Sequence, residues 1–312
     1  MNIIRMALVL PTPEQRIFIW KELNENVKTR DQDLEHIKEW LLKQPHLPDT
    51  WDDQRILSFL RGCNFSLEKT KKKLDMYFTM RAALPEFFTN RDINRPELKA
   101  ITKLGQGPPL PGLTPGGRRV TIIRGFDKNI PTPNIADIMK LALMLGDIRL
   151  EVETYGVAGD IYILDASVLT AGHFARAANP ILAKKFLVCV QEAYPVKVKE
   201  VHIVNATPLV DTVVSWVKPF VKEKLRKRIH CHTSLETLYP FVPKDILPEE
   251  YGGMAGTLAE YNEQWIKKLE EYTPWFKDQE NVKADESKRP GKPTNYNDLF
   301  GLEGSFKQLN ID

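Results

Sequence analysis

The sequence predicts an α/β protein in which an all-helical N-terminal domain packs on a domain with a mostly parallel sheet. Up to about residue 95, apolar residues recur at helical spacing and no strand-like run interrupts them. Beyond residue 100, β-branched segments alternate with helical ones, which favours parallel strands joined by crossover helices. The chain has 312 residues, a length that suits one or two domains with a sizeable core.

The N-terminal helices follow from their apolar faces. Residues 12–44 fit one or two charged helices, and the segment DDQRILSFLRGCNF carries one apolar face. In SLEKTKKKLDMYFTMRAAL, Leu67, Leu74 and Phe78 share a side. The turn-rich connector PPLPGLTPGGRR then predicts the change to β structure.

Three β-branched segments, RVTIIRG, GDIYILDAS and VKEVHIVNA, predict the strands, with helices over residues 135–153 and 177–193 between them. Within GDIYILDAS, Ile161 and Ile163 face one side of the sheet, and Tyr162 and Leu164 face the other. A further helix is predicted over residues 259–275. The polar, proline-containing segment ENVKADESKRPGKPTNYND predicts a mobile tail.

Composition narrows the function classes. The chain is 42% hydrophobic and 27% charged, as ordinary globular proteins are, and its net charge of +3 is too small for a bulk nucleic-acid binder. Cys63, Cys189 and Cys231 are odd in number and widely spaced, which favours a reducing compartment over a disulfide framework. No cleavage pattern of a signal peptide opens the chain, and no stretch reaches membrane-spanning length. We therefore expect a cytoplasmic protein.

The most informative segment is the amphiphilic helix predicted over residues 207–229. It carries two adjacent apolar stripes, which are Leu209, Val213, Trp216 and Phe220, and Val210, Val214, Val217 and Val221. Six cations between Lys218 and Arg228 follow, opposed only by Glu223. Such a helix suits an element that covers an apolar cavity and meets an anionic surface. The alternative is a buried core helix whose cations complement its dipole. Pro219 predicts a break in the helix.

The indole side chain of Trp216 suggests which stripe faces outward, because indoles favour membrane interfaces. We expect the stripe of Leu209, Val213, Trp216 and Phe220 to face outward as a membrane contact. The other stripe then faces the cargo. Ordinary core packing is the alternative for each of the predicted cavity-lining residues, which are Leu141, Leu145, Tyr162, Leu164, Phe186, Val190, Val210, Val214, Val217 and Val221.

Catalytic and metal sites are not expected. His230 and His232 form an HxH pair without further ligands at metal-like spacing. Asp165 ends a predicted strand, but neither a nucleophile elbow nor a glycine-rich phosphate loop accompanies it. An enzyme acting on lipid esters would need a nucleophile–base pair that the sequence does not offer. We therefore expect no enzyme, no catalytic residue, no metal and no cofactor.

The segments ILSFLRGCNFSLEKTKKKLDMYFTMR, IYILDAS, YPVKVKEVHIVNA, VKPFVKEKLRKRIHCH and LPEEYGG resemble, in this order, the CRAL-TRIO lipid-transfer family. The resemblance covers residues 50–260 and is strongest for the branch of α-tocopherol transfer protein and cellular retinaldehyde-binding protein. The ending LFGLEGSFKQL resembles arthropod members. The resemblance implies a helical N-terminal domain (1–95), a CRAL-TRIO domain (96–258) with a mobile lid helix over a lipid cavity, and a C-terminal helix and tail (259–312).

The resemblance also implies a phosphoinositide site made of Lys197, Lys199, Lys224 and Arg228, with Arg61 as a further member. Lys197 and Lys199 point the same way if their segment is a strand, and Lys224 and Arg228 stack on one face if theirs is a helix. Converging cations suit a multiply phosphorylated headgroup. Cys63 stands where the branch often has another arginine, which leaves the headgroup selectivity open.

Together these features predict a cytoplasmic, monomeric carrier that binds peripherally and reversibly to membranes. Its cargo would be a hydrophobic small molecule, tocopherol-, retinoid- or carotenoid-like, and phosphoinositides would promote its release. The alternative is a phosphoinositide- or lipid-sensing regulator or trafficking adaptor with the same fold. A protein partner that binds only the lipid-loaded form would favour this alternative.

Overall fold

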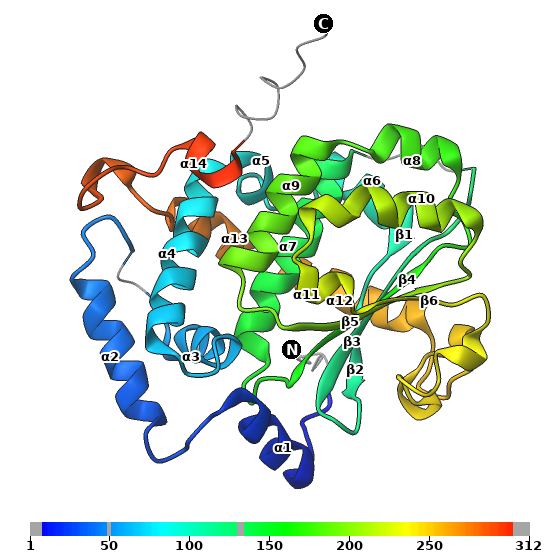
Figure 1. Cartoon of the computed structure of the whole chain (residues 1–312), viewed down its shortest axis with the longest axis horizontal. Coiled ribbons are helices and arrows are strands. Elements are labelled where there is room, and N and C mark those ends of the chain that lie inside the picture. The colour runs from blue at the N-terminus through cyan, green and yellow to red at the C-terminus, as the bar shows by residue number, and fades with distance from the viewer. Residues whose placement is uncertain (1–7, 49–50, 130–133, 302–312) are drawn as a thin grey trace, which may run out of the picture.

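The computed structural model describes residues 8–48, 51–129 and 134–301 (Figure 1). As predicted, its N-terminal region is helical. The helices are α1 (Pro13–Leu23), α2 (Arg30–Leu42), α3 (Asp53–Gly62), α4 (Leu67–Ala83), α5 (Pro85–Phe88) and α6 (Pro96–Thr102). Helix α1 begins at a capping box, in which the Gln15 amide donates to the Thr12 hydroxyl and the Thr12 amide donates to the Gln15 side chain. None of the described helices is long and apolar enough to span a bilayer.

A six-stranded, mostly parallel sheet follows within the described residues, which confirms the predicted fold class. Its strands are β1 (Gly105–Gln106), β2 (Pro109–Leu113), β3 (Arg118–Gly125), β4 (Gly159–Asp165), β5 (Val198–Val204) and β6 (Ile229–Cys231). Strands β3 to β6 pair in parallel, and β1 and β2 both pair antiparallel to β3. The predicted strand segments are therefore β3, β4 and β5.

The two faces of the sheet are covered differently. Ile161 and Ile163 are fully buried on one face, where they pack with Ile122 and with the segment that contains Leu238 and Val242. The opposite face carries Tyr162 and Leu164, as the alternation predicted. It lies beneath helices α7 (Ile135–Val152), α8 (Ala171–Ala177), α9 (Pro180–Val188) and α10 (Pro208–Val217) (Figure 1). The helix predicted over 177–193 thus begins at Pro180, and it ends in a π-helical turn, Cys189–Ala193.

Helix α7 stands between the N-terminal helices and the sheet domain (Figure 1). Leu143 and Leu150 pack into the core formed mainly by α3 and α4, together with Phe59 and Tyr77. Asp147, on the same side of α7, is fully buried in this contact. Because one helix contributes to the cores of both regions, the two regions share an apolar interface.

The amphiphilic segment is interrupted rather than continuous. Helix α10 ends at Val217, a 3-10 turn covers Lys218–Phe220, and a short helix α11 covers Glu223–Arg226. The break predicted from Pro219 is confirmed, since proline cannot donate the next helical hydrogen bond. The expectation that Lys224 and Arg228 share a helical face is wrong, because α11 ends before Arg228.

The C-terminal part returns to the N-terminal helices. It contains α12 (Leu258–Glu271), α13 (Thr273–Asp278) and α14 (Tyr296–Phe300), and α14 lies against α9, where the Lys185 amine sits over the Tyr296 ring. Two nitrogens of Arg289 donate to the carboxylate of Asp75 on α4, each at 2.8 Å. Phe300 is buried in the same core as α4. The segment that we expected to be a mobile tail, residues 280–298, is instead docked by this ion pair, and Phe300 just beyond it is buried.

Candidate functional site

A cavity of about 490 Å³ lies between helix α7, the sheet and helices α8 and α10. Its wall is mainly aliphatic and aromatic. The residues that line the cavity include Leu104, Gln106, Ile123, Arg124, Ile135, Ile138, Leu141, Leu145, Asp165, Leu169, Phe174, Val213, Trp216, Trp265 and Ile266. The volume falls within the range of about 300–1,000 Å³ that is typical of small-molecule sites.

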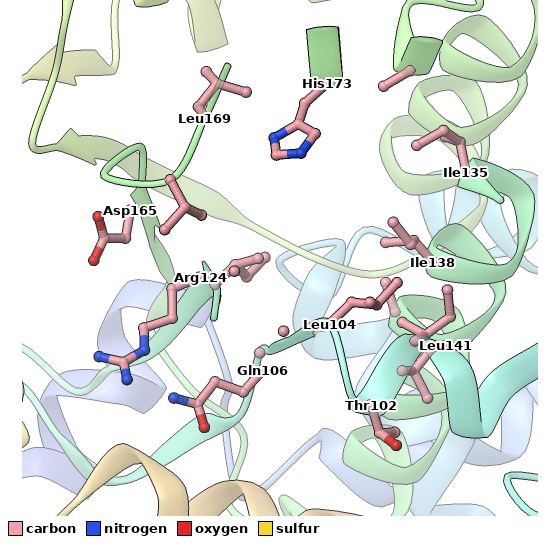
Figure 2. Close-up of a pocket in the computed structure, with 18 of the residues that line it drawn as sticks. Thr102, Leu104, Gln106, Arg124, Ile135, Ile138, Leu141, Asp165, Leu169 and His173 are labelled. Atoms are coloured by element: carbon pink, nitrogen blue, oxygen red, sulfur yellow. The ribbon is translucent and has the colours of Figure 1, made fainter. Parts of the chain in front are cut away.

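Several polar groups of the cavity gather on one side, whereas Thr102 and His173 lie elsewhere on its wall (Figure 2). Figure 2 shows Asp165, Arg124 and Gln106 there, opposite Ile138 and Leu141 of α7. Asp165 accepts hydrogen bonds from the Asn205 amide at 2.8 Å, the Ser167 backbone at 2.9 Å and the Tyr251 hydroxyl at 2.9 Å.

These hydrogen bonds favour the ionised form of the Asp165 carboxyl group. Burial alone would raise the pKa of Asp165, but the three donors hold it below its usual range. The carboxylate therefore fixes the end of β4 and is poorly suited to act as a general base.

Helix α10 turns two members of its tryptophan stripe, Val213 and Trp216, toward the cavity, which corrects the expected outward orientation of these two side chains. Val213 and Trp216 line the cavity. The Trp216 ring meets Phe174 of α8 edge-on, with 5.8 Å between ring centroids, so α8 and α10 close this side of the cavity together. Phe220 lies against Trp216 at 5.7 Å, and Leu209 is half-buried. The indole thus buries its apolar area inside the protein rather than at a surface.

The second stripe of α10 lies elsewhere. Val210 is 2% exposed and packs with Ala166 and Ile203 at the ends of β4 and β5, and Val214 packs on the same group. Val217 is half-buried and Val221 is buried, but neither is among the residues that line the cavity. Because α10 starts directly after β5, its valine stripe meets the strand ends before it could reach the cavity.

Of the other predicted lining residues, Leu141 and Leu145 do line the cavity. Leu164 packs beneath α10, and Phe186 and Val190 pack against the core of the N-terminal helices. Tyr162 lies beside Arg149 and Asp160, farther along the same face of the sheet. These four side chains are therefore packing residues, the alternative that the sequence left open.

Three segments supply lining residues that were not predicted from the sequence. Leu104 and Gln106 come from the α6–β1 connection, Phe174 comes from α8, and Trp265 and Ile266 come from α12. The apolar positions of α12 were a usable signal, but they follow the predicted lipid domain in the chain. The segment around α8 gave no signal, since that helix has only seven residues, none of them buried.

The predicted anion site gathers at the start of β5. Lys197 and Lys199 are two residues apart, on either side of Val198. The Arg228 guanidinium donates to the Val198 carbonyl at 2.6 Å. Lys224 of α11 is exposed and close enough to Lys197 for their charges to interact. Four of the five predicted cations therefore lie around one strand end.

The environment of Lys197 shows how crowded the positive charge is. Burial, with smaller contributions from the charges of Lys199 and Lys224, lowers the pKa of the Lys197 amine to about 8. An anion placed between these side chains would relieve that repulsion. The site is thus suited to bind negative charge.

Arg61 is not available to this group. It is 5% exposed, and its Nε and one terminal nitrogen donate to both carboxylate oxygens of Glu25, at 2.9 and 3.1 Å. A third nitrogen donates to the Thr154 carbonyl at 2.8 Å. The placement of Arg61 in the phosphoinositide site is therefore corrected, because its guanidinium fastens α1 and the α7–β4 connection to α3.

The histidines near the sheet edge are also bonded to one another. His202 shares a hydrogen bond of 2.9 Å with His232, and its other ring nitrogen lies 3.1 Å from the Glu200 carboxylate. In the described part of the chain, no group of three or more histidine, cysteine or acidic side chains is arranged to hold a metal ion.

Known proteins resemble this chain in sequence. The profile of the CRAL/TRIO domain matches residues 108–253, and that of the Pinta-like UBA domain matches residues 26–98. The α-tocopherol transfer protein-like protein of Mus musculus is 32% identical over 82% of this chain and 75% of its own. The protein of the same description from Homo sapiens is 33% identical over 76% and 69%, and Clavesin-2 of Rattus norvegicus is 28% identical over 75% and 72%. The solved structure of Sfh5 covers 86% of this chain at 13% identity, with a TM-score of 0.49.

Fold and cavity together define an α/β protein with an internal apolar chamber beside a helical N-terminal region. From its sequence relatives, the chain belongs to the CRAL-TRIO family, in the branch of the tocopherol transfer proteins.

Proposed function

We propose that this protein carries a hydrophobic small molecule in the cavity and transfers it between membranes. The observation that carries the proposal is the largely apolar chamber of about 490 Å³ whose wall includes Val213 and Trp216 of α10. Each methylene group that a cargo buries there contributes roughly 0.8 kcal/mol, so a prenyl or polyene chain would be retained for long times. The likeness to α-tocopherol transfer protein-like relatives supports a tocopherol-like cargo, and a retinoid- or carotenoid-like molecule is the other cargo that we propose for an apolar chamber.

Release would be coupled to the membrane. The basic group of Lys197, Lys199, Lys224 and Arg228 would meet phosphoinositide headgroups, and α8 and α10 would move apart to open the chamber. The break at Pro219 joins these two parts, because it lies between the cavity-lining end of α10 and the cations of α11. The carrier would be cytoplasmic and monomeric and would bind membranes reversibly, without covalent chemistry.

Cargo binding is tested by filling the chamber. Leu145→Trp adds a large ring to the wall, so the purified variant should yield severalfold less extractable lipid, by mass spectrometry, than the wild-type protein. Leu42→Trp is the matched control, since Leu42 is an exposed side chain far from the chamber. Equal lipid content in Leu145→Trp and wild type, with both proteins folded, would overturn the carrier proposal.

Membrane-coupled release is tested separately. Lys199→Gln combined with Lys224→Gln should slow transfer of a fluorescent cargo to vesicles that contain a phosphatidylinositol bisphosphate, while cargo content stays unchanged. Transfer at the wild-type rate would exclude the basic group as the trigger. A protein partner that binds only loaded protein would instead favour the sensing adaptor.

A further inference from the structure

The basic group at the start of β5 has a neighbour of opposite charge on α1. Helix α1 is fixed there by several contacts that do not involve this charge. Ile19 and Leu23 are buried against Leu113 and Ala158, and Glu25 is paired with Arg61. The backbone of α1 is therefore anchored beside the strand end.

Glu22 is the acidic residue that this helix presents to the cations. Its carboxylate forms an ion pair with the amine of Lys199. That bond lowers the pKa of Glu22, and the charges of Lys199, Lys197 and Arg118 contribute to the lowering. One carboxylate thus lies within the influence of three cations, two of which belong to the predicted anion site.

Asn64 ties the second lysine to the same place. Its amide nitrogen donates to the Glu22 carbonyl at 3.2 Å, and its amide oxygen accepts from the Lys197 amine. Lys197, just before β5, and Lys199, within it, therefore already have partners on or next to α1. An incoming phosphate therefore competes with these contacts for the two amines.

We propose that Glu22 is a built-in competitor for the anion site, and that its carboxylate holds Lys199 until a multiply phosphorylated headgroup displaces it. The inference rests on the proposed binding of phosphoinositides at this site. The Glu22 side chain is 38% exposed, so it can rotate into solvent while Ile19, Leu23 and Glu25 keep α1 in place. The competitor thus sets the affinity of the site without any unfolding.

The test is Glu22→Gln, which removes the charge and keeps the shape. Binding to vesicles of phosphatidylcholine with a phosphatidylinositol bisphosphate should tighten by up to about fivefold, the upper end of the range expected for loss of a competing, partly exposed ion pair. Glu14→Gln is the matched control, because it removes one charge from the exposed first turn of the same helix. It should bind like the wild-type protein. Equal affinities of Glu22→Gln and wild type would overturn the proposal.

A second arm distinguishes the source of the phosphate. Soluble inositol trisphosphate, followed by calorimetry, should also bind Glu22→Gln more tightly, because competition acts on the headgroup itself. If only vesicle binding changes and soluble headgroup binding does not, Glu22 acts on membrane docking and the competitor proposal is wrong.

A third variant separates this inference from the proposed function. Lys199→Gln removes the partner of Glu22, so adding Glu22→Gln to it should tighten vesicle binding by clearly less than in the wild-type background. An equal gain in both backgrounds would contradict the competition. If Lys199→Gln alone leaves vesicle binding unchanged, the membrane part of the proposed function fails. If it weakens binding but Glu22→Gln does not strengthen it, only the role of Glu22 fails.

Discussion

At the scale of single residues, neighbours decide what a charged side chain can do. Arg61 and Lys197 were both assigned to the anion site, yet only Lys197 lies among its cations. Arg61 is consumed by the bidentate pair with Glu25. The buried guanidinium would lose these hydrogen bonds if it turned toward a phosphate. Breaking a buried ion pair costs more free energy than breaking an exposed one.

The lowered pKa of Lys197 predicts a pH-dependent affinity. Its amine is half deprotonated near pH 8, so binding of a phosphorylated headgroup should be strongest below that pH and weaken as the pH rises through it. Exposed lysines stay charged up to about pH 10 and do not produce this fall. Vesicle binding measured between pH 7 and about 9.5 gives the profile.

Lys197→Arg is the variant that isolates this effect, since a guanidinium stays charged throughout the range. The fall in affinity above pH 8 should flatten in the variant. The same fall in both proteins would mean that another group titrates.

At the scale of elements, the break after α10 is the feature with a mechanical consequence. Pro219→Ala restores a backbone donor and lets α10 continue through the 3-10 turn. If the continued helix is worth about 1 kcal/mol, cargo transfer should slow about fivefold. Stopped-flow transfer to acceptor vesicles measures this rate. Pro243→Ala, at a turn outside α10 and the cavity, should leave it unchanged.

The contact between β5 and β6 predicts sensitivity to acid. Fully buried His202 faces the Glu200 carboxylate, which pairs with Arg118, and stacks near His230, His232 and Phe241. Burial lowers the pKa of His202 to about 4, below the ordinary value of 6.5. The folded state therefore resists a proton that the unfolded chain accepts, so stability is complete above pH 6.5 and is lost as the pH falls toward 4.

His202→Gln should remove most of this dependence. Between pH 7 and about 4, we expect the free energy of unfolding of the wild-type protein to fall about 1–3 kcal/mol more than that of the variant. Urea titrations at the two pH values measure it. Parallel losses in both proteins would assign the acid sensitivity to other groups.

At the scale of the whole molecule, Asp147 joins the two regions. Its carboxylate accepts from the Tyr77 and Tyr194 hydroxyls at 2.7 and 2.8 Å, and from Arg81 and Arg91 at 3.0 and 2.6 Å. Burial alone would raise the pKa of Asp147, but the two arginines hold it well below its usual range. The carboxylate stays charged, and it compensates two buried cations.

Asp147→Asn should therefore destabilise the protein by roughly 3–5 kcal/mol, because both guanidinium groups lose their buried counterion. Asp31→Asn, at an exposed position of α2, should change stability by less than about 0.5 kcal/mol. Chemical denaturation of both variants checks this. A small effect of Asp147→Asn would show that the helical region and the sheet domain are held together chiefly by apolar packing.

Local sequence patterns predicted much of the fold. The β-branched runs predicted β3, β4 and β5, the apolar spacing predicted α7, and Pro219 predicted the break after α10, because each depends on residues near one another in the chain. Lys197 and Lys199 could likewise be paired from the period of a strand. No comparable pattern predicted the buried ion cluster around Asp147 of α7. The side chains that bind Asp147 come from α4, from the segment after α5 and from the segment before β5, which are far from α7 in the sequence.

The sequence by itself determined which residues share a face of a helix or strand, since that follows from backbone periodicity alone. Only the tertiary structure decided what each face meets. It turned Trp216 inward against Phe174, paired Arg61 with Glu25, and docked Arg289 on Asp75. These partners are between 36 and 214 residues apart along the chain, and their meeting depends on how whole elements pack, which no local period encodes.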